Sequence, residues 1–360
     1  MNRQAARFLA ATLVLVAGIV TGLAQELKQA RDLNNMAAMY YRQGDYSKAE
    51  SLYKRALAVW EAAGASAQTD AVTALNNLSV LYRAQARFPE AEALCRRALT
   101  SRETALGTEH PSVAASLNDL AEILRRQGRW AEAEPLIRRA IRIVEKALGP
   151  AHPRLVVPLN ILAAIEWSRQ RYAEAESLYL RAVELGAEAM EPGDPMVATS
   201  MNNLAQIYIA QKKYDTAEPL LQQARSIWEN ALGPEHPNVA TSLNNLAQIR
   251  RLQGRHIDAE PLYRRALAIW ETAYGPEHPD VAKGLMNLGA LFYLQGKFAG
   301  AAALYRRSLA IFEAKLGADH PYTIACVENL ATVLRSQGRL TEAKSLRRQD
   351  SALLPENRGR

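Results

Sequence analysis

The sequence predicts an all-α, right-handed α-solenoid of about eight helix pairs. Three observations lead to this fold class: one pattern returns every 42 residues, apolar residues follow helical spacing inside each copy, and proline and glycine recur at fixed places between the helices. Self-similarity at a fixed period is typical of repeat architectures. We therefore expect the chain of 360 residues to grow as an array, without the separate cores of several globular domains.

The period is clearest in one heptapeptide. Ser242–Gln248 (SLNNLAQ) repeats Ser200–Gln206 (SMNNLAQ) at a distance of 42 residues, and stepping in both directions gives eight copies without insertion or deletion. We expect a solenoid over residues 25–354 and a polar tail over residues 355–360. The repeats are predicted near residues 27–65, 69–107, 111–149, 153–191, 195–233, 237–275, 279–317 and 321–354.

Residues 1–24 have the composition of a secretory signal peptide. Arg3 and Arg7 precede an uncharged run over residues 8–24, which ends in small residues flanking Leu23. A positive segment, an apolar segment and a small-residue cleavage site are the parts of such a signal. The run is shorter than the roughly 20 residues of a spanning helix. We expect cleavage after Ala24 and export to the periplasm or the medium. The alternatives are an uncleaved membrane anchor and a cytosolic protein with an apolar first helix.

Each copy has the pattern of two antiparallel helices joined by a tight turn. In the third copy, Leu117, Leu120 and Leu124 lie on one face of the first helix. Pro111 suits the first helical position, where its missing N–H costs nothing. Gly128 is a C-terminal stop signal, after which the second helix begins and runs to a Leu-Gly-Pro sequence.

Two positions in the second helix are the same in all eight copies. In most copies the second helix begins with an aromatic residue. An alanine comes three residues after that position, and a leucine comes three residues after the alanine. A small residue lets the two helices approach closely, and the ring and the leucine are expected to fill the space between them. The alanines are Ala49, Ala91, Ala133, Ala175, Ala217, Ala259, Ala301 and Ala343; the leucines are Leu52, Leu94, Leu136, Leu178, Leu220, Leu262, Leu304 and Leu346.

The complete pattern resembles a known family. Leu-Asn-Asn-Leu-Ala, then Gln-Gly-Arg, then Ala-Glu-Pro-Leu-Tyr-Arg-Arg-Ala-Leu, then Leu-Gly-Pro-Glu-His-Pro is similar to tetratricopeptide repeats, in the 42-residue form of kinesin light chains. The resemblance covers roughly residues 27–354. It implies a concave groove, lined by the first helices, that holds an extended peptide. Kinesin light chains carry a heptad coiled coil before the repeats; a signal-like segment stands there in this chain, so the motor role is not carried over.

The histidines and cysteines are predicted to be structural. Five histidines share the position before the first-helix proline, and aspartate takes that position in a sixth copy, which indicates helix capping. Neighbouring copies lie roughly 10 Å apart, whereas Zn–N bonds measure about 2.0–2.1 Å, so we expect no metal site. Cys95 and Cys326 lie in the second and eighth repeats, too distant for a disulfide, and are expected to be unpaired and buried. The capping positions are His110, His152, Asp194, His236, His278 and His320.

Basic pairs recur along the second helices, and the net charge is +7. A basic stripe could bind nucleic acid. However, glutamates stand four residues before the first base of several pairs, in the favoured orientation for an ion pair on one helix. We therefore interpret the stripe as a solvated outer face. The bases are Lys54, Arg96, Arg138 and Arg264, and their glutamates are Glu50, Glu92, Glu134 and Glu260.

The candidate binding residues form a stripe on the first helices, separate from their apolar face. Asparagines there could hold a peptide backbone as donors and acceptors, arginines could pair with acidic side chains, and aromatic rings could form an apolar floor. The alternative for the first asparagine of each Asn-Asn pair is a bridge between adjacent repeats; the second, such as Asn245, is interpreted as structural. The predicted site consists of Asn76, Arg83, Asn118, Arg125, Asn160, Trp167, Asn202, Gln206, Asn244, Gln248, Arg251, Tyr293 and Arg335.

The predicted function is a non-enzymatic scaffold that binds an extended, acidic peptide of a protein partner. The sequence holds no Ser/His/Asp set, no phosphate-cradling glycine loop and no isolated carboxylate pair, so we expect neither an enzyme nor a cofactor. Alternatives are a single-stranded nucleic-acid binding repeat, a membrane-tethered cell-envelope assembly factor, and a hydrolase without a recognisable motif. Membrane contact is expected only through residues 8–24, if they are retained.

Overall fold

The computed structural model describes residues 3–43, 45–190 and 193–351, with side chains for residues 21–41, 43, 45–188, 190 and 193–346. Over the described residues it contains α-helices, two short 3-10 helices and no strand. The first four repeats contain α1 (Arg3–Arg42), α2 (Tyr46–Ala62), α3 (Gln68–Ala84), α4 (Phe88–Leu106), α5 (Pro111–Arg126), α6 (Trp130–Leu148), α7 (Val156–Ser168) and α8 (Tyr172–Ala189). The last four contain α9 (Pro195–Ala210), α10 (Tyr214–Leu232), α11 (Pro237–Leu252), α12 (His256–Tyr274), α13 (Pro279–Leu294), α14 (Phe298–Leu316), α15 (Pro321–Ser336) and α16 (Leu340–Ser351).

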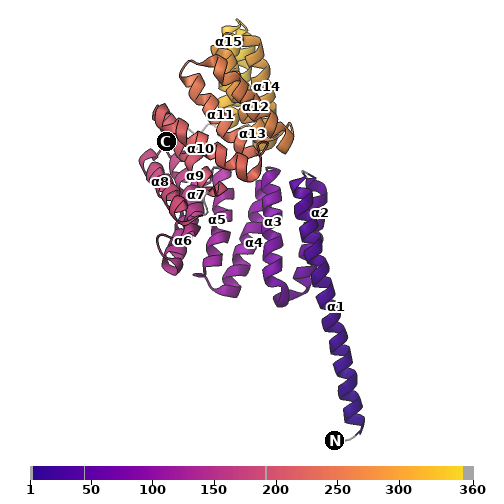
Figure 1. The fold of residues 1–360 in the computed structure, drawn as a ribbon. Helices are drawn as coiled ribbons and strands as arrows, with labels where there is room; N and C mark the ends of the chain where they lie inside the picture. Colours follow the sequence, from indigo (N-terminus) through magenta and orange to yellow (C-terminus); the bar gives the residue numbers. More distant parts are fainter. Residues whose placement is uncertain (1–2, 44, 191–192, 352–360) are drawn as a thin grey trace, which may run out of the picture. The chain divides into compact units, whose positions relative to one another are not determined.

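These helices form two compact units, Met1–Ile143 and Val144–Arg360. Within the units successive helices pack on one another, as α3, α4 and α5 do in the first unit (Figure 1). In the second unit the first helices of neighbouring repeats also touch, α11 on α13 and α13 on α15. The predicted all-α solenoid built from successive helix pairs is confirmed.

Helix α1 is longer than the first repeat requires. It runs without a break from Arg3 to Arg42, across the expected cleavage site after Ala24 and the expected start of the first repeat at residue 27. No helix among the residues searched for membrane spans is long and apolar enough to cross a bilayer. Most of the apolar run over residues 8–24 lies outside the described side chains. The polar residues Arg347–Asp350, which the sequence predicts to cap the final helix pair, also lie outside them.

Most first helices begin at the expected caps, and His152 caps the 3-10 helix Pro153–Leu155 that precedes α7. In five repeats a histidine Nδ1 accepts the backbone N–H two residues further on, and in the repeat that begins at Pro195, Asp194 Oδ1 does the same at 2.7 Å. Each bond satisfies an N–H that has no partner within the helix. The capping role is confirmed at His110, His152, His236, His278 and His320, with N–H to Nδ1 distances of 3.1 to 3.2 Å.

The turn between the two helices of a repeat requires a left-handed backbone. Four repeats place a glycine there with positive φ, for example Gly254 at 77°. Three repeats place a side chain in the same conformation: Ala86, Gln170 and Lys212 have φ of 58°, 62° and 60°. A residue with a Cβ atom is strained in this region. The turn geometry is therefore imposed by the helix pair even where the sequence lacks glycine.

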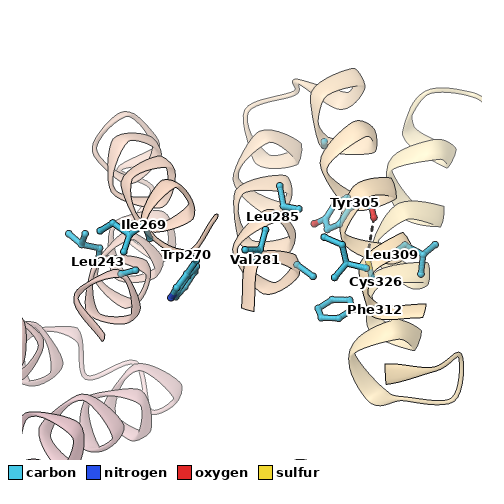
Figure 2. Close-up of a cluster of buried hydrophobic side chains, with 14 of the residues drawn as sticks. Leu243, Ile269, Trp270, Val281, Leu285, Tyr305, Leu309, Phe312 and Cys326 are labelled. Carbon is cyan, nitrogen blue, oxygen red and sulfur yellow. Dashed lines mark hydrogen bonds between the residues drawn. The ribbon is translucent and has the colours of Figure 1, made fainter. Parts of the chain in front are cut away.

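The shared alanines lie in the centre of the core. Seven of the eight are 0% exposed and Ala343 is 4% exposed. The shared leucines are half-buried and pack on the edge of the core clusters. In the first seven repeats the residue after the leucine is the buried one, as Tyr263 and Tyr305 show. Figure 2 shows such a cluster, which runs from Leu243 on α11 to Cys326 on α15 and so continues across repeat boundaries.

The two cysteines are free and buried, as predicted. Cys95 and Cys326 are 1% and 0% exposed. Burial raises the pKa of each thiol to about 11, although Ser79 beside Cys95 and Ser308 beside Cys326 act in the opposite direction. The reactive form of cysteine is the thiolate. Because both thiols stay protonated at neutral pH, we interpret Cys95 and Cys326 as unreactive core residues.

Candidate functional site

The outer face carries the expected ion pairs within helices. Lys54, Arg96, Arg138 and Arg264 each contact the glutamate four residues earlier, at 2.6 to 2.9 Å. Many of these side chains are exposed, so each pair stabilises its helix by only about 0.3–0.5 kcal/mol. The interpretation of the basic stripe as a salt-bridged outer face is confirmed for these four bases.

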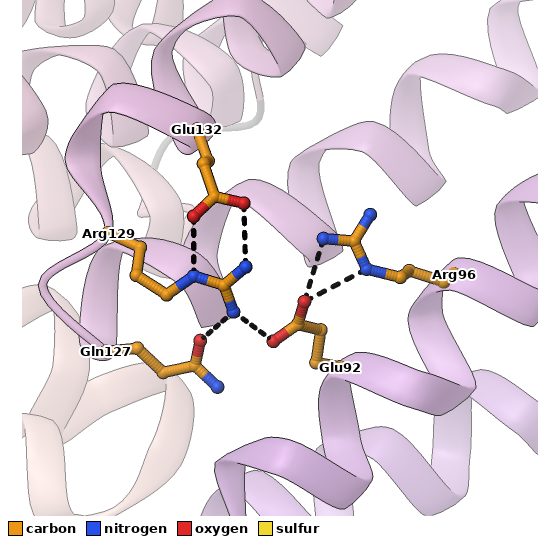
Figure 3. Close-up of polar contacts among 5 residues, drawn as sticks. All are labelled: Glu92, Arg96, Gln127, Arg129 and Glu132. Atoms are coloured by element: carbon orange, nitrogen blue, oxygen red, sulfur yellow. Dashed lines mark hydrogen bonds and ion pairs between the residues drawn. The ribbon is translucent and has the colours of Figure 1, made fainter.

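The same glutamates also bind the following repeat, which the sequence interpretation missed. Glu92 accepts from Arg96 on its own helix at 2.8 Å and from Arg129 at 2.5 Å, and Arg129 in turn pairs with Glu132 at 2.7 Å (Figure 3). Arg87 and Glu50 form the corresponding contact one repeat earlier, at 2.8 Å. In both places an ion pair joins the turn of one repeat to the second helix of the repeat before it.

A second set of arginines links repeats at a constant separation of 36 residues. Arg139 contacts Glu103 at 2.7 Å, Arg181 contacts Glu145 at 2.8 Å and Arg307 contacts Glu271 at 2.7 Å. Each of these arginines also donates to a backbone carbonyl in the loop of the preceding repeat. Many outer basic side chains are thus paired with glutamates. The recurring Glu-to-Arg separation of 36 residues is the signal in the sequence that could have revealed these ion pairs between repeats.

On the first helices, the asparagine pairs form rungs between repeats. The second asparagine of one repeat donates through Nδ2 to Oδ1 of the first asparagine of the preceding repeat, 43 residues earlier. The three rungs are Asn77 to Asn34 at 3.0 Å, Asn245 to Asn202 at 2.9 Å and Asn287 to Asn244 at 2.9 Å. The structural role expected for Asn245 is confirmed.

These rungs change the interpretation of the first asparagines. Asn160, Asn202 and Asn244 are only 9%, 4% and 8% exposed, and Asn160 donates to Ser200 Oγ at 2.6 Å. Their expected place on an exposed stripe is therefore corrected: the neighbouring first helix covers them. The bridge between repeats, left open as the alternative, is what these three side chains form.

Not every asparagine at this position completes a rung. Asp119 stands at the donor position of the third repeat, and Oδ1 of Asn76 is buried without a hydrogen-bond partner among the described residues. Oδ1 of Asn118 is also buried without a partner there, and so is Oδ1 of Asn160, although Asn203 stands at the donor position of the fifth repeat. Asn76 and Asn118 are half-buried as residues.

The arginines of the predicted stripe differ in their electrostatic surroundings. Arg125 pairs with Glu122 through two bonds of 2.7 and 2.9 Å. Although burial acts to raise the pKa of Glu122, Arg125 and Arg126 hold that pKa well below its ordinary value. Arg83 is half-buried and faces the carboxyl group of Asp119. In the first unit, both stripe arginines therefore already face an acid.

Arg251 in the second unit has no such acid. No ion pair joins it to a carboxylate among the described residues, and its Nε is buried without a partner. Its guanidinium lies near two phenols, Tyr263 and Tyr305, whose pKa values burial raises and Arg251 lowers; that of Tyr305 is about 12. The hydroxyl of Tyr263, a residue that is 1% exposed, lies against this guanidinium. Arg251 Nε thus remains a buried donor without an acceptor among the described residues.

The aromatic residues of the stripe pack on the ring that begins the second helix of the same repeat. Trp167 contacts Tyr172 edge-on, with ring centroids 4.9 Å apart, and Tyr293 contacts Phe298 at 5.6 Å. Trp167 and Tyr293 remain half-buried. Each therefore presents part of a fixed ring, held at a defined orientation, to the surface.

Three stripe residues of the second unit occupy the same place in successive repeats: Arg251 on α11, Tyr293 on α13 and Arg335 on α15. Arg335 is exposed, and its Nη2 donates to Thr332 Oγ1 at 2.9 Å. Gln248 is half-buried one turn before Arg251, as Gln206 is on α9. We call Arg251, Tyr293, Arg335 and Gln248 the unpaired stripe, because no carboxylate among the described residues forms an ion pair with its two arginines, although Arg335 and Tyr293 have neutral hydrogen-bond partners. Over the described residues, no group of three His, Cys, Asp or Glu side chains is placed to hold a metal ion.

Comparisons with known proteins agree with this architecture. The tetratricopeptide repeat family model matches seven overlapping segments, residues 28–104, 70–146, 112–188, 153–229, 196–271, 240–314 and 285–349. The comparison with curated proteins gives no match.

Solved structures give similar folds. BtubC (BKLC) from P. vanneervenii is 26% identical, with a TM-score of 0.50, and covers 65% of this chain and 94% of its own. Kinesin light chain repeats from Podosopora anserina are 26% identical, with a TM-score of 0.44, over 57% of this chain and 98% of theirs. A Rap protein complexed with competence and sporulation factor is 15% identical, with a TM-score of 0.53, over 89% of this chain and 99% of its own.

Proposed function

The chain belongs to the tetratricopeptide repeat family, and from this premise we propose that it is a non-enzymatic protein-interaction scaffold that binds an extended, acidic peptide. The peptide would lie along the first helices, in the concave groove expected from the sequence, and its acidic side chains would meet the unpaired stripe of the second unit. The observation that carries the proposal is the absence of a carboxylate partner for Arg251 among the described residues.

The chemistry of the unpaired stripe favours a carboxylate. A guanidinium presents a rigid fork of N–H groups that matches a carboxylate in two parallel bonds. A buried N–H group without an acceptor costs about 1–3 kcal/mol, so a ligand acceptor at Arg251 would recover that loss. Tyr293 offers part of a ring between Arg251 and Arg335, which suits an apolar side chain between two acids.

The occupied outer face argues against the nucleic-acid alternative. Binding to phosphates requires several free cations on one face, whereas many outer arginines are paired with glutamates of their own or the preceding repeat. The protein partner therefore remains our proposal, with Trp167 and Gln206 of the second unit as secondary contacts. The peptide-binding role of Asn76, Asn118 and Arg83 in the first unit stays a prediction.

We also propose that the scaffold is exported, on the strength of residues 1–24. A positive start, an apolar run and small residues before Gln25 are the parts that signal peptidase recognises. Mass spectrometry of the native protein tests this proposal: a mature N-terminus at Gln25 supports export, and an intact Met1 supports the membrane-tethered alternative.

The binding proposal is tested with the full chain and a pool of fluorescent peptides, acidic, neutral and basic, by fluorescence polarisation. Arg251→Gln should weaken binding of the acidic peptides about 10-fold, since one charge-assisted bond contributes roughly 1.4 kcal/mol or more. Arg335→Gln should weaken it less, because Arg335 is exposed.

Two matched variants serve as controls. Arg264→Gln removes a paired arginine of the outer face, and Arg125→Gln removes an arginine at the same repeat position that already has Glu122. Both should leave the affinity within about 2-fold of the wild type, because exposed or already paired charges contribute little. Equal losses in Arg264→Gln and Arg251→Gln, or no preference for acidic peptides, would contradict the proposal.

A further inference from the structure

Asp119 occupies the position at which three other repeats place a hydrogen-bond donor. The three asparagine rungs all join a donor to an acceptor 43 residues earlier. Counted in the same way, Asp119 on α5 is the donor position opposite Asn76 on α3. An ionised carboxylate can only accept hydrogen bonds. An aspartate here therefore cannot complete the rung in its ordinary charged form.

The acceptor of this rung is present and unused. Asn76 Oδ1 is buried, and no donor among the described residues reaches it. Asn34, Asn202 and Asn244, at the equivalent position, each have Oδ1 occupied by the asparagine of the next repeat, whereas Asn160 Oδ1 is unpaired although an asparagine, Asn203, stands opposite it in the register. At Asn76 the structure thus leaves a buried acceptor opposite a carboxyl group, by the same 43-residue register.

We propose that Asp119 takes up a proton and donates it to Asn76 Oδ1, so that the rung between the second and third repeats closes in acid and opens as the pH rises. The protonated carboxyl group has the donor that the amide of asparagine provides in the other rungs. In this form the rung carries no charge. The first-helix face of the first unit then gains one net positive charge, because the acid facing Arg83 is neutral.

The surroundings of Asp119 favour the protonated form of its carboxyl group. Burial raises its pKa, and Glu122 on the same helix acts in the same direction, while Arg83 on α3 and Arg102 on α4 oppose it. Cys95 on α4 is a further titratable neighbour, kept neutral by its own raised pKa. Neither arginine forms an ion pair with Asp119 within the described residues, and Arg102 donates instead to Ser116 Oγ.

The direction of the pH effect follows from the raised pKa. The folded chain binds this proton more tightly than the unfolded chain, so the rung stabilises the fold at acid pH. That contribution is lost as the pH rises through the pKa of Asp119 in the folded chain. Asp119→Asn supplies a permanent donor, so the variant should be at least as stable as the wild type at every pH and clearly more stable above neutrality.

Hydrogen exchange of the α3 and α5 amides, measured from pH 5 to pH 8 and corrected for the intrinsic rate, tests the proposal. At pH 8, Asp119→Asn should slow exchange in these helices roughly 10-fold, because it satisfies a buried acceptor. The difference should shrink as the pH falls. Asp215→Asn, which removes an exposed carboxylate on α10, should leave the exchange of α3 and α5 unchanged.

A double-mutant cycle separates the rung from general electrostatics. If Asn76 is the acceptor, the gain from Asp119→Asn should disappear in an Asn76→Ala background. If the gain persists there, Asp119 acts through burial or Arg83 and the proposed rung is wrong. Infrared spectra give an independent reading: as the pH falls, the wild type should show the C=O band of a buried protonated carboxyl group at a higher pH than an ordinary aspartate would, and Asp119→Asn should lack this band. Its absence from the wild type would overturn the proposal.

Discussion

Replacing Lys212 by glycine should stabilise the second unit. Lys212 ends the turn between α9 and α10 with φ of 60°, and Gly254 holds the same place one repeat later with φ of 77°. The left-handed conformation costs a residue with a Cβ atom roughly 1–2 kcal/mol. Glycine removes that strain but loses about 0.5–1 kcal/mol more backbone entropy on folding. The net gain should be about 0.5–1 kcal/mol.

The side chain of Lys212 is exposed, so little else changes with it. The backbone bonds of the turn, Lys212 N–H to Ile209 O at 3.0 Å and Lys213 N–H to Tyr208 O at 2.8 Å, are independent of the side chain. Lys212→Ala is the matched control, since it removes the charge and keeps the Cβ atom in the strained region. Gly254→Ala is the reciprocal change and should destabilise the turn by about 1 kcal/mol.

Urea unfolding followed by circular dichroism, together with hydrogen exchange in α9 and α10, measures the effect. Both readings are needed because repeat arrays need not unfold in one step. The midpoint should rise for Lys212→Gly, stay unchanged for Lys212→Ala and fall for Gly254→Ala. If Lys212→Ala stabilises as much as Lys212→Gly, charge and not backbone strain is the cause. If Lys212→Gly destabilises the unit, the reasoning about the turn is wrong.

Three further outcomes follow from the contacts. Asn245→Ala removes the donor of the rung to α9 and should cost about 1–3 kcal/mol in urea unfolding, whereas an exposed asparagine-to-alanine change on the same array should cost under about 0.5 kcal/mol. Burial lowers the pKa of His236 and of His320, so the folded chain binds these protons less tightly than the unfolded chain. The contribution of the two caps to stability should be complete above the ordinary histidine pKa and decline below it. A urea midpoint that does not fall in acid would contradict the capping role of neutral His236 and His320. Cys95 and Cys326, with pKa values raised to about 11, should react with iodoacetamide only in urea; rapid modification of the native chain would show that they are accessible.

The sequence allowed the helix pairs to be predicted because their determinants are local. Proline starts, glycine stops and apolar spacing act within one repeat, and the substitution of Asp194 for histidine identified the capping position before any contact was known. The period then placed eight copies of the same unit along the chain. These features need no knowledge of how one repeat sits on the next.

The contacts between repeats were harder to predict. Asn244 lies at the edge of the apolar face of α11. Helical spacing does not tell whether α13 covers this edge; in the structure Asn244 is 8% exposed. The difference between Arg125 and Arg251 was present in the sequence, since Glu122 stands three residues before one and Gln248 before the other. Treating the stripe arginines as equivalent overlooked this difference.

The constant separations of the links between repeats have a consequence for the length of the array. Three outer arginines reach a glutamate 36 residues earlier, and each of the asparagine rungs spans 43 residues. If one complete 42-residue repeat with these residues were excised or duplicated, the arginine of one neighbour would meet the glutamate of the next in the same register. The number of repeats can therefore change by unequal recombination while these links keep their register, and the length of the first-helix face can change with it.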